Sequence, residues 1–176
     1  MKKIPTFLAL MQSRMAQASI GPSSLRNQGK SRVIEICRNF CSECMDLSKY
    51  TPKTFRTQLD KDTRKLLKEL GMKETQWGTA RKALNLFLRD VFYNKYLAPT
   101  YKMDQLEPLL EIPLDTQVAE KIQEYPQGKN LPWNRIKHTT KDENIAFQDA
   151  ARDIAKVNIL IRFRVHLDLI FWRSIK

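Results

Sequence analysis

Three segments of the chain carry, in order, side chains that could do chemistry together; they span residues 78–85, 112–119 and 166–172. The first contains Lys82, whose amine can act as a nucleophile once it has lost its proton. The second contains Asp115, whose carboxylate can stabilise a positive charge that develops beside it. Taken singly, each residue also fits a structural role. Lys82 could be a solvated helix residue, Asp115 a helix cap, and Trp172 of the third segment a packing residue. The chemistry therefore depends on whether the fold brings the segments together.

Helices are the elements that must position these residues. Apolar residues recur at helical spacing, and no alternating run long enough for a strand lies between the glycine and proline breakers. The pattern predicts an all-α fold, a compact helical domain, with helices over 4–18, 31–45, 51–70 and 78–96, a turn near 106–110, a short helix after Asp115, and helices from 140 onward and over 164–173. Lys82 then falls on the most apolar of these helices, which we expect to be central, and Asp115 falls at an N-cap.

Local signals indicate where several helices begin and end. Thr51 and the proline after it are typical of an N-cap and first helical position, and Gly71 is typical of the end of the same helix. Thr140 and Glu143 have the spacing of a capping box. Residues 124–139, rich in lysine and arginine, read as an exposed loop, and residues 1–11 as the start of an amphipathic helix rather than a signal peptide.

The cysteines and histidines are the other candidates for chemistry. Cys37, Cys41 and Cys44 have the spacing with which radical enzymes hold an iron–sulfur cluster, but those enzymes need a barrel of alternating strands and helices. The same spacing places all three thiols on the buried face of a helix, which is the interpretation we favour. His138 and His166 have no companion at metal-ligand spacing, so we expect no metal and no cofactor. Three cysteines are also unlike a secreted disulfide scaffold, which indicates an intracellular, cytoplasmic location.

The composition bounds the class of protein. The chain has 176 residues, 42% of them hydrophobic, with 31 Lys and Arg against 19 Asp and Glu, a formal net charge of +12. These values suit one domain, expected to be monomeric, and exclude collagen-like, low-complexity and disordered classes. No stretch approaches the ~20 apolar residues of a membrane span. The positive excess favours a polyanionic partner, because neutralising phosphates releases counterions.

The three segments together resemble the helix-hairpin-helix DNA glycosylase superfamily. Residues 78–85, Gly-Thr-Ala-Arg-Lys-Ala-Leu-Asn, are similar to its G-x-G-R-K-x-A-N segment, which opens the second hairpin helix and carries the nucleophilic lysine. Residues 112–119, Ile-Pro-Leu-Asp-Thr-Gln-Val-Ala, are similar to its V-D-x-x-V/I-x-R segment, which carries the catalytic aspartate. The spacing between these two and the final His-Leu-Asp-Leu-Ile-Phe-Trp are most similar to the archaeal 8-oxoguanine DNA glycosylase branch. The resemblance runs from Gly71 to Trp172, so we treat residues 71–176 as a glycosylase-like region. Residues 1–70 are N-terminal helices without a clear match.

The resemblance implies a DNA glycosylase with AP-lyase activity that excises a damaged or modified base, with oxidised guanine favoured. In that chemistry Lys82 attacks C1′ of the deoxyribose and forms a Schiff base, while Asp115 stabilises an oxocarbenium-like transition state. The partner is double-stranded DNA with the target base flipped out of the stack. The residues implied around that base are Asp168, Trp172, Pro113 and His166. The residues expected to contact DNA are Lys73, Gly78, Arg81, Arg135 and Lys137, with Trp133 stacking on an unpaired base.

The chain departs from the family pattern at the hairpin. Ala80 replaces the usual second glycine, residues 72–77 replace the Leu-Pro-Gly turn, and Glu120 or Lys121 stands where an arginine often follows the aspartate. These departures keep a second class of function open, a non-catalytic basic helical module that binds DNA or an acidic protein. The first hypothesis requires Lys82 and Asp115 to face one cleft, and the second does not.

Overall fold

The computed structural model describes residues 6–21, 25 and 31–173, with side chains up to Phe171. In this part of the chain the regular elements are helices, and no strand occurs. The α-helices are α1 (Phe7–Ser19), α2 (Ser31–Asn39), α3 (Phe55–Leu70), α4 (Trp77–Tyr93), α5 (Leu97–Thr100), α6 (Thr116–Gln123), α7 (Lys141–Val157) and α8 (Leu167–Arg173). The all-α fold class is therefore confirmed. None of the described helices combines the length and the apolar character needed to cross a membrane.

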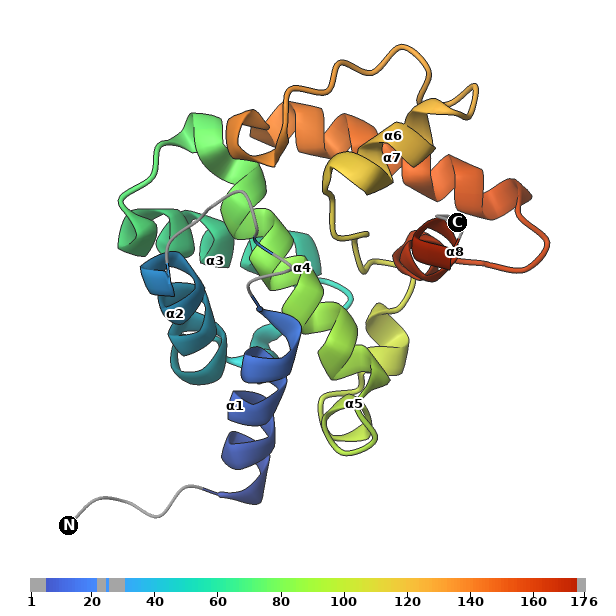
Figure 1. The fold of residues 1–176 in the computed structure, drawn as a ribbon. Helices are drawn as coiled ribbons and strands as arrows, with labels where there is room; N and C mark the ends of the chain where they lie inside the picture. Colours follow the sequence, from blue (N-terminus) through green and yellow to red (C-terminus); the bar gives the residue numbers. More distant parts are fainter. Residues whose placement is uncertain (1–5, 22–24, 26–30, 174–176) are drawn as a thin grey trace.

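Helix α4 runs through the middle of the molecule, with α1, α2 and α3 on one side and α6, α7 and α8 on the other (Figure 1). All of its residues from Trp77 to Leu88 are buried. The predicted central position of this helix is therefore confirmed, although the helix ends at Tyr93 rather than residue 96.

Two hydrophobic clusters flank α4. The N-terminal core is built mainly from α1 to α5 and includes the apolar face of α4, which consists of Ala80, Ala83, Leu84, Phe87, Leu88 and Val91. The C-terminal core is built from α6 to α8 and the segments between them, for example Val118 and Phe147, and takes no apolar residue from α4. Helix α4 therefore turns its apolar face to the first core and polar residues to the second, and we call that second boundary the seam.

Local signals set several of the helix ends. The Thr140 hydroxyl accepts a hydrogen bond from the Glu143 N–H (3.3 Å), and the Glu143 carboxylate accepts one from the Thr140 N–H (2.7 Å), which confirms the capping box. Gly71 ends α3 at a φ of 65°, as predicted. The predicted start at Thr51 is wrong, because residues 51–54 form a separate turn in which the hydroxyls of Thr51 and Thr54 hydrogen-bond at 2.8 Å. Likewise, residues 164–166 form a separate 3₁₀ turn before α8.

Helix α2 continues into a π-helical turn, Phe40–Cys44, which changes the direction of its last side chain. Cys37 and Cys41 are buried as predicted, but Cys44 is exposed, so that part of the prediction is wrong. The i→i+5 hydrogen bond of a π turn, here from the Met45 N–H to the Phe40 carbonyl at 3.0 Å, takes Cys44 off the α-helical face. Burial, with a smaller effect of nearby Glu69, raises the pKa of Cys37 to about 12, so this thiol stays protonated at neutral pH.

Candidate active site

Lys82 and Asp115 meet across the seam. Nζ of Lys82 lies 3.2 Å from Oδ2 of Asp115, which is both hydrogen-bond and ion-pair distance. The Lys82 side chain is 8% exposed and that of Asp115 is 19% exposed, so the pair is nearly buried and reaches the surface on the Asp115 side. The two segments that the sequence analysis pairs therefore lie together in the fold.

Asp115 is held in place by its own helix and by α7. Its Oδ1 accepts a hydrogen bond from the Val118 N–H at 2.9 Å, so Asp115 is the N-cap of α6, as predicted. The side-chain amide of Gln148 clamps the preceding segment, because its Oε1 accepts from the Ile112 N–H (3.0 Å) and its Nε2 donates to the Ile112 carbonyl (2.8 Å). One carboxylate oxygen thus fixes the helix, and the other remains directed at Lys82.

Asp168 belongs to the same group of charges. It lies in the first turn of α8, is buried, and accepts a hydrogen bond from Arg89 of α4, which also pairs with Asp90 at 2.8 Å. Burial raises the pKa of Asp168; the positive charges of Arg89 and Lys82 oppose this rise, and the negative charge of Asp115 adds to it. Two ion pairs, Lys82 with Asp115 and Arg89 with Asp168, thus connect α4 to α6 and α8, and we call these four residues the Lys82 cluster.

Trp133 and Trp172 are the two tryptophans expected at the site. Trp133 is half-buried, with its Nε1 3.5 Å from Oγ1 of Thr116, the residue after Asp115. Its ring packs edge-on against Phe147, with 5.3 Å between ring centroids. Trp133 therefore lies next to the Lys82 cluster. The backbone of Trp172 is part of α8, and its side chain lies outside the described residues.

Arg81 points into a different polar cluster. Its guanidinium donates to Asp60 (2.7 Å), Thr63 (2.9 Å) and Glu111 (2.9 and 3.1 Å), and Lys141 lies 2.6 Å from Asp60. Only 1% of Arg81 is exposed. The predicted contact of Arg81 with DNA is therefore wrong, because the charge is buried and already neutralised by two carboxylates. We call Asp60, Arg81, Glu111 and Lys141 the Arg81 cluster.

The N-terminus of α4 is covered by the loop that precedes α7. The Gly78 N–H donates to the Thr139 carbonyl at 3.0 Å, and a Cβ at Gly78 would lie 2.6 Å from the Ile136 carbonyl oxygen. The Gly78 amide is therefore already bonded to Thr139 and packed against Ile136, so this structure does not present it to a DNA phosphate. The other predicted backbone contacts lie on the surface: Lys73 and Arg135 are exposed and Lys137 is half-buried.

Two more residues implied around the base are His166 and Pro113, which precede Asp168 and Asp115 by two positions each. The ring nitrogens of His166 lie 2.7 Å from the Tyr93 hydroxyl and 2.8 Å from the Glu107 carboxylate. Tyr93 is about three turns of α4 beyond Lys82, roughly 16 Å along the helix axis at ~1.5 Å per residue. Pro113 is buried in the segment that precedes Asp115. The structure thus pairs Lys82 with Asp115 and Arg89 with Asp168, while His166 bonds to Tyr93 and Glu107 and Pro113 is buried.

Arg89 and Asn85 are polar residues of the seam that the sequence analysis missed. Arg89 holds Asp168, and Asn85 donates to Glu111 at 3.0 Å while its buried Oδ1 finds no hydrogen-bond partner among the described residues. A signal for them exists in the sequence, because Lys82, Asn85 and Arg89 recur at spacings of three and four residues on an otherwise apolar helix. Such a polar stripe indicates that the helix meets polar partners on its second face.

An amine held beside a carboxylate in a nearly buried site can do chemistry at an electrophilic carbon. The amine can form a bond to that carbon, and the carboxylate can stabilise positive charge on it. Within the described part of the chain, no group of three or more His, Cys, Asp or Glu side chains could hold a metal ion. No protein-family model, curated protein or solved structure matches the chain.

Proposed function

We propose that the protein is a DNA glycosylase with AP-lyase activity that removes a damaged or modified base, with oxidised guanine favoured. The observation that carries this proposal is the 3.2 Å contact between Nζ of Lys82 and Oδ2 of Asp115. These are the nucleophile and the charge-stabilising carboxylate that the reaction needs, brought together from separate segments. The net charge of +12 supports a polyanionic substrate.

In the proposed reaction Lys82 acts on C1′ of the target nucleotide. Its unprotonated amine forms a bond to C1′ while the bond from C1′ to the base breaks, and the base leaves with the electron pair and takes up a proton. The nitrogen then gives up one proton, and O4′ takes one up as the sugar ring opens to a protonated imine between C1′ and Nζ; removal of a C2′ proton then expels the 3′ phosphate. Asp115 faces the positive charge that develops on the sugar during the first step, where stabilisation lowers the barrier.

The base itself would bind near α8. Asp168 offers a hydrogen-bond acceptor within the same group of charges as Lys82 and Asp115. We assign the stacking surface for the flipped base to Trp172, four residues further along α8. Trp133, beside Thr116, is then at the rim of the site.

Reductive trapping tests this proposal. Sodium borohydride reduces an imine to a stable amine, so the protein mixed with duplexes carrying an oxidised, deaminated or abasic nucleotide should give a covalent protein–DNA species. Lys82→Gln should abolish this species. Lys141→Gln is the matched control, because Lys141 also pairs with an aspartate, but in the Arg81 cluster, and it should trap as the parent does. No trapped species from the parent on any of these duplexes would refute the proposal.

The covered N-terminus of α4 favours a second candidate function, a non-catalytic module that binds DNA or an acidic protein through its basic surface. The Gly78 amide, bonded to the Thr139 carbonyl, is not free to capture a phosphate. In this case duplex binding weakens as salt rises and is the same in Lys82→Gln and Asp115→Asn as in the parent. Loss of turnover with retained binding in these two variants would exclude this second function.

A further inference from the structure

The turn between α7 and α8 carries an open pocket that the proposed function does not use. Its volume is about 590 Å³, which suits a small-molecule ligand. The lining combines four cationic residues, Arg152, Lys156, Arg162 and Arg164, with the aliphatic residues of 159–161 and contains no acidic residue. A pocket of this composition selects for a ligand that is both apolar and negatively charged.

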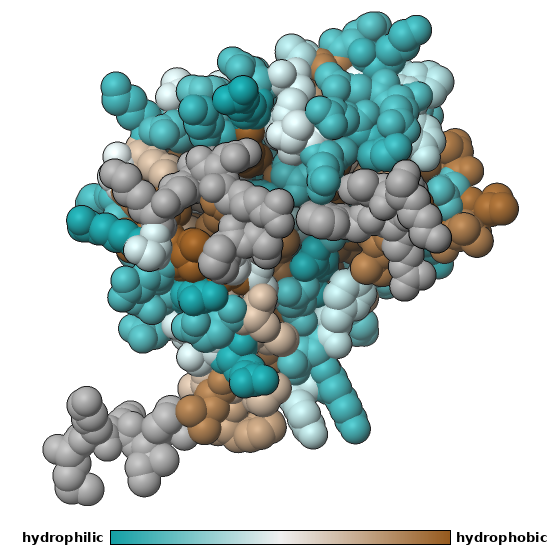
Figure 2. Space-filling model, viewed as in Figure 1, coloured by the Kyte–Doolittle hydropathy of each residue, from teal (hydrophilic) through white to brown (hydrophobic). Residues whose placement is uncertain are grey.

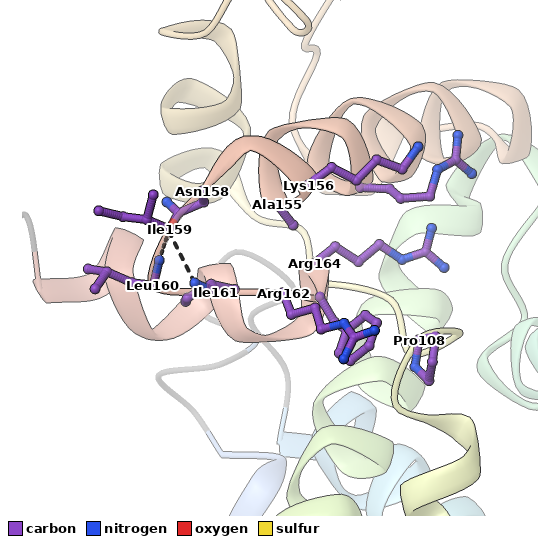
Figure 3. Close-up of a pocket in the computed structure, with 11 residues that line it drawn as sticks. Pro108, Ala155, Lys156, Asn158, Ile159, Leu160, Ile161, Arg162 and Arg164 are labelled. Carbon is purple, nitrogen blue, oxygen red and sulfur yellow. Dashed lines mark hydrogen bonds between the residues drawn. The ribbon is translucent and has the colours of Figure 1, made fainter.

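The apolar and the charged parts of the lining are separated. Figure 3 shows Ile159 and Leu160 on the side of the turn opposite to that on which the side chains of Lys156 and Arg164 end. Ile159 is 99% exposed and Leu160 is 81% exposed, and Figure 2 shows hydrophobic surface at this edge of the molecule. Covering such aliphatic surface is favourable in proportion to the area removed from water. The pocket therefore offers an apolar end to a ligand.

Two of the four cations are already paired. Arg152 and Lys156 each form an ion pair at 2.8 Å with an aspartate of α7 that does not line the pocket, Asp149 and Asp153 respectively. Their charges are partly neutralised, so they contribute little to the attraction of an anion.

Arg162 and Arg164 are the cations that remain for a ligand. Within the described part of the chain, no carboxylate lies at ion-pair distance from either. The Arg164 guanidinium donates instead to the backbone carbonyls of Leu110 (2.9 Å) and Leu109 (2.8 Å), with a longer bond to Gln148 (3.4 Å), which leaves part of its five N–H groups unused. Burial lowers the pKa of Arg164, although the charge of Glu111 opposes this, so the guanidinium gains from an added negative charge.

We propose that this pocket binds an amphipathic anion, a single aliphatic chain with a terminal phosphate or carboxylate. The head group lies at Arg162 and Arg164, and the chain covers Ile159 and Leu160. The lining favours a chain over a nucleobase, because Asn158, its one uncharged polar side chain, already accepts from the Leu160 N–H at 2.9 Å and the Ile161 N–H at 3.2 Å. A base would find donors in the Asn158 amide and the cations but no side-chain acceptor for the N–H groups of its polar edge.

Calorimetric titration of the full chain with hexyl, octyl and decyl phosphate, each below its micelle-forming concentration, tests the proposal. One site should bind all three, with affinity rising up to about fourfold per added methylene group. Decanoate should bind as well, and inorganic phosphate far more weakly. The proposal is overturned if adenosine monophosphate binds more tightly than octyl phosphate, or if the protein binds phosphatidylserine vesicles but no monomeric alkyl phosphate.

Two variants locate the site. Arg162→Glu should weaken decyl phosphate about tenfold, since it replaces attraction by repulsion at the head group. Arg32→Glu is the matched control, because Arg32 is exposed on α2 and the change in net charge is the same, and it should leave the affinity unchanged. Leu160→Asp should remove most of the dependence on chain length. Both pocket residues are exposed, so the variants should unfold at the parent's temperature, and equal affinity in Arg162→Glu and Arg32→Glu contradicts the proposed site.

Discussion

Arg81 and Lys82 are adjacent on α4, yet they enter two polar clusters of different character. In the Arg81 cluster one buried guanidinium bonds two carboxylates and a hydroxyl, and Asp60 has a second cation in Lys141. In the Lys82 cluster the lysine has one carboxylate partner, and the cluster is open to solvent at Asp115. The first arrangement uses its polar groups on one another. The second leaves an amine and a carboxylate that a ligand can still engage.

The two clusters also shift the pKa values of their buried carboxylates in opposite directions. Burial alone would raise the pKa of Glu111, but the charges of Arg81 and Arg164 and the hydrogen bonds from Arg81 and Asn85 outweigh it, and the pKa is lowered. In Asp168 burial prevails over the charge of Arg89, and the pKa is raised. A carboxylate whose charge is not fully compensated by its surroundings is typical of functional sites. The comparison therefore supports a structural role for the Arg81 cluster and agrees with the chemistry proposed for the Lys82 cluster.

The largest effect should come from removing Arg81. Arg81→Met leaves Asp60 with Lys141 alone and Glu111 with one hydrogen bond each from Asn85 and Asn144 but no ion-pair partner, and breaking a buried pair in this way costs about 3–5 kcal/mol of the free energy of unfolding. Urea denaturation followed by circular dichroism measures this change.

Lys82→Met is the matched variant for that measurement. It carries the same chemical change one residue further along α4, but Asp115 keeps its capping bond to Val118 and its access to solvent. We expect a loss below about 2 kcal/mol. Equal losses in the two variants would show that both clusters are structural.

Replacing Glu111 should give the next largest effect, and one that depends on pH. A carboxylate whose pKa is lowered on folding stabilises the protein above its unfolded pKa of about 4.3, and this contribution is lost as the pH falls through the folded value. Glu111→Gln should therefore be less stable than the parent at pH 7, by about 1–3 kcal/mol, and the difference should shrink below pH 4. Urea denaturation at several pH values measures it. A difference that is the same at pH 7 and pH 3 would contradict the lowered pKa.

These contrasts show which features a sequence can reveal. Capping at Thr140 and the end of α3 at Gly71 depend on residues within a few positions, so local patterns predict them. The directions of Arg81 and Lys82 depend on partners far along the chain, and adjacent residues on a helix point about 100° apart, so periodicity alone cannot assign them. Asp60, a main partner of Arg81, lies within residues 1–70, where the resemblance has no clear match. The pairing of Lys82 with Asp115 was accessible only through the resemblance.

Asp115 allows the structural and the chemical use of one side chain to be separated. Asp115→Ala removes the cap of α6 and should lower the free energy of unfolding by about 1 kcal/mol. Asparagine also caps well, so Asp115→Asn should lower it by only about a few tenths of a kcal/mol. Thermal unfolding of the two variants measures the difference. Both variants should slow base excision to a similar extent, by about 10²-fold or more, since neither carries the charge. If Asp115→Asn excises as the parent does, the carboxylate acts only as a cap.

Asp168→Asn should change the stability little at pH 7, with a pH dependence opposite in sign to that of Glu111. A carboxylate whose pKa is raised on folding stabilises the protein most below its unfolded pKa of about 3.9, and this contribution is lost as the pH rises through the folded value. Asparagine has no charge to bury, so the free energy of unfolding of Asp168→Asn should rise relative to that of the parent between pH 3 and pH 7. At pH 7 the two should differ by no more than about 1 kcal/mol. In the same urea series, the free energy of unfolding of Glu111→Gln should fall relative to that of the parent over the same pH range. If both variants move in the same direction as the pH rises, the two clusters do not differ in the way that their carboxylates indicate.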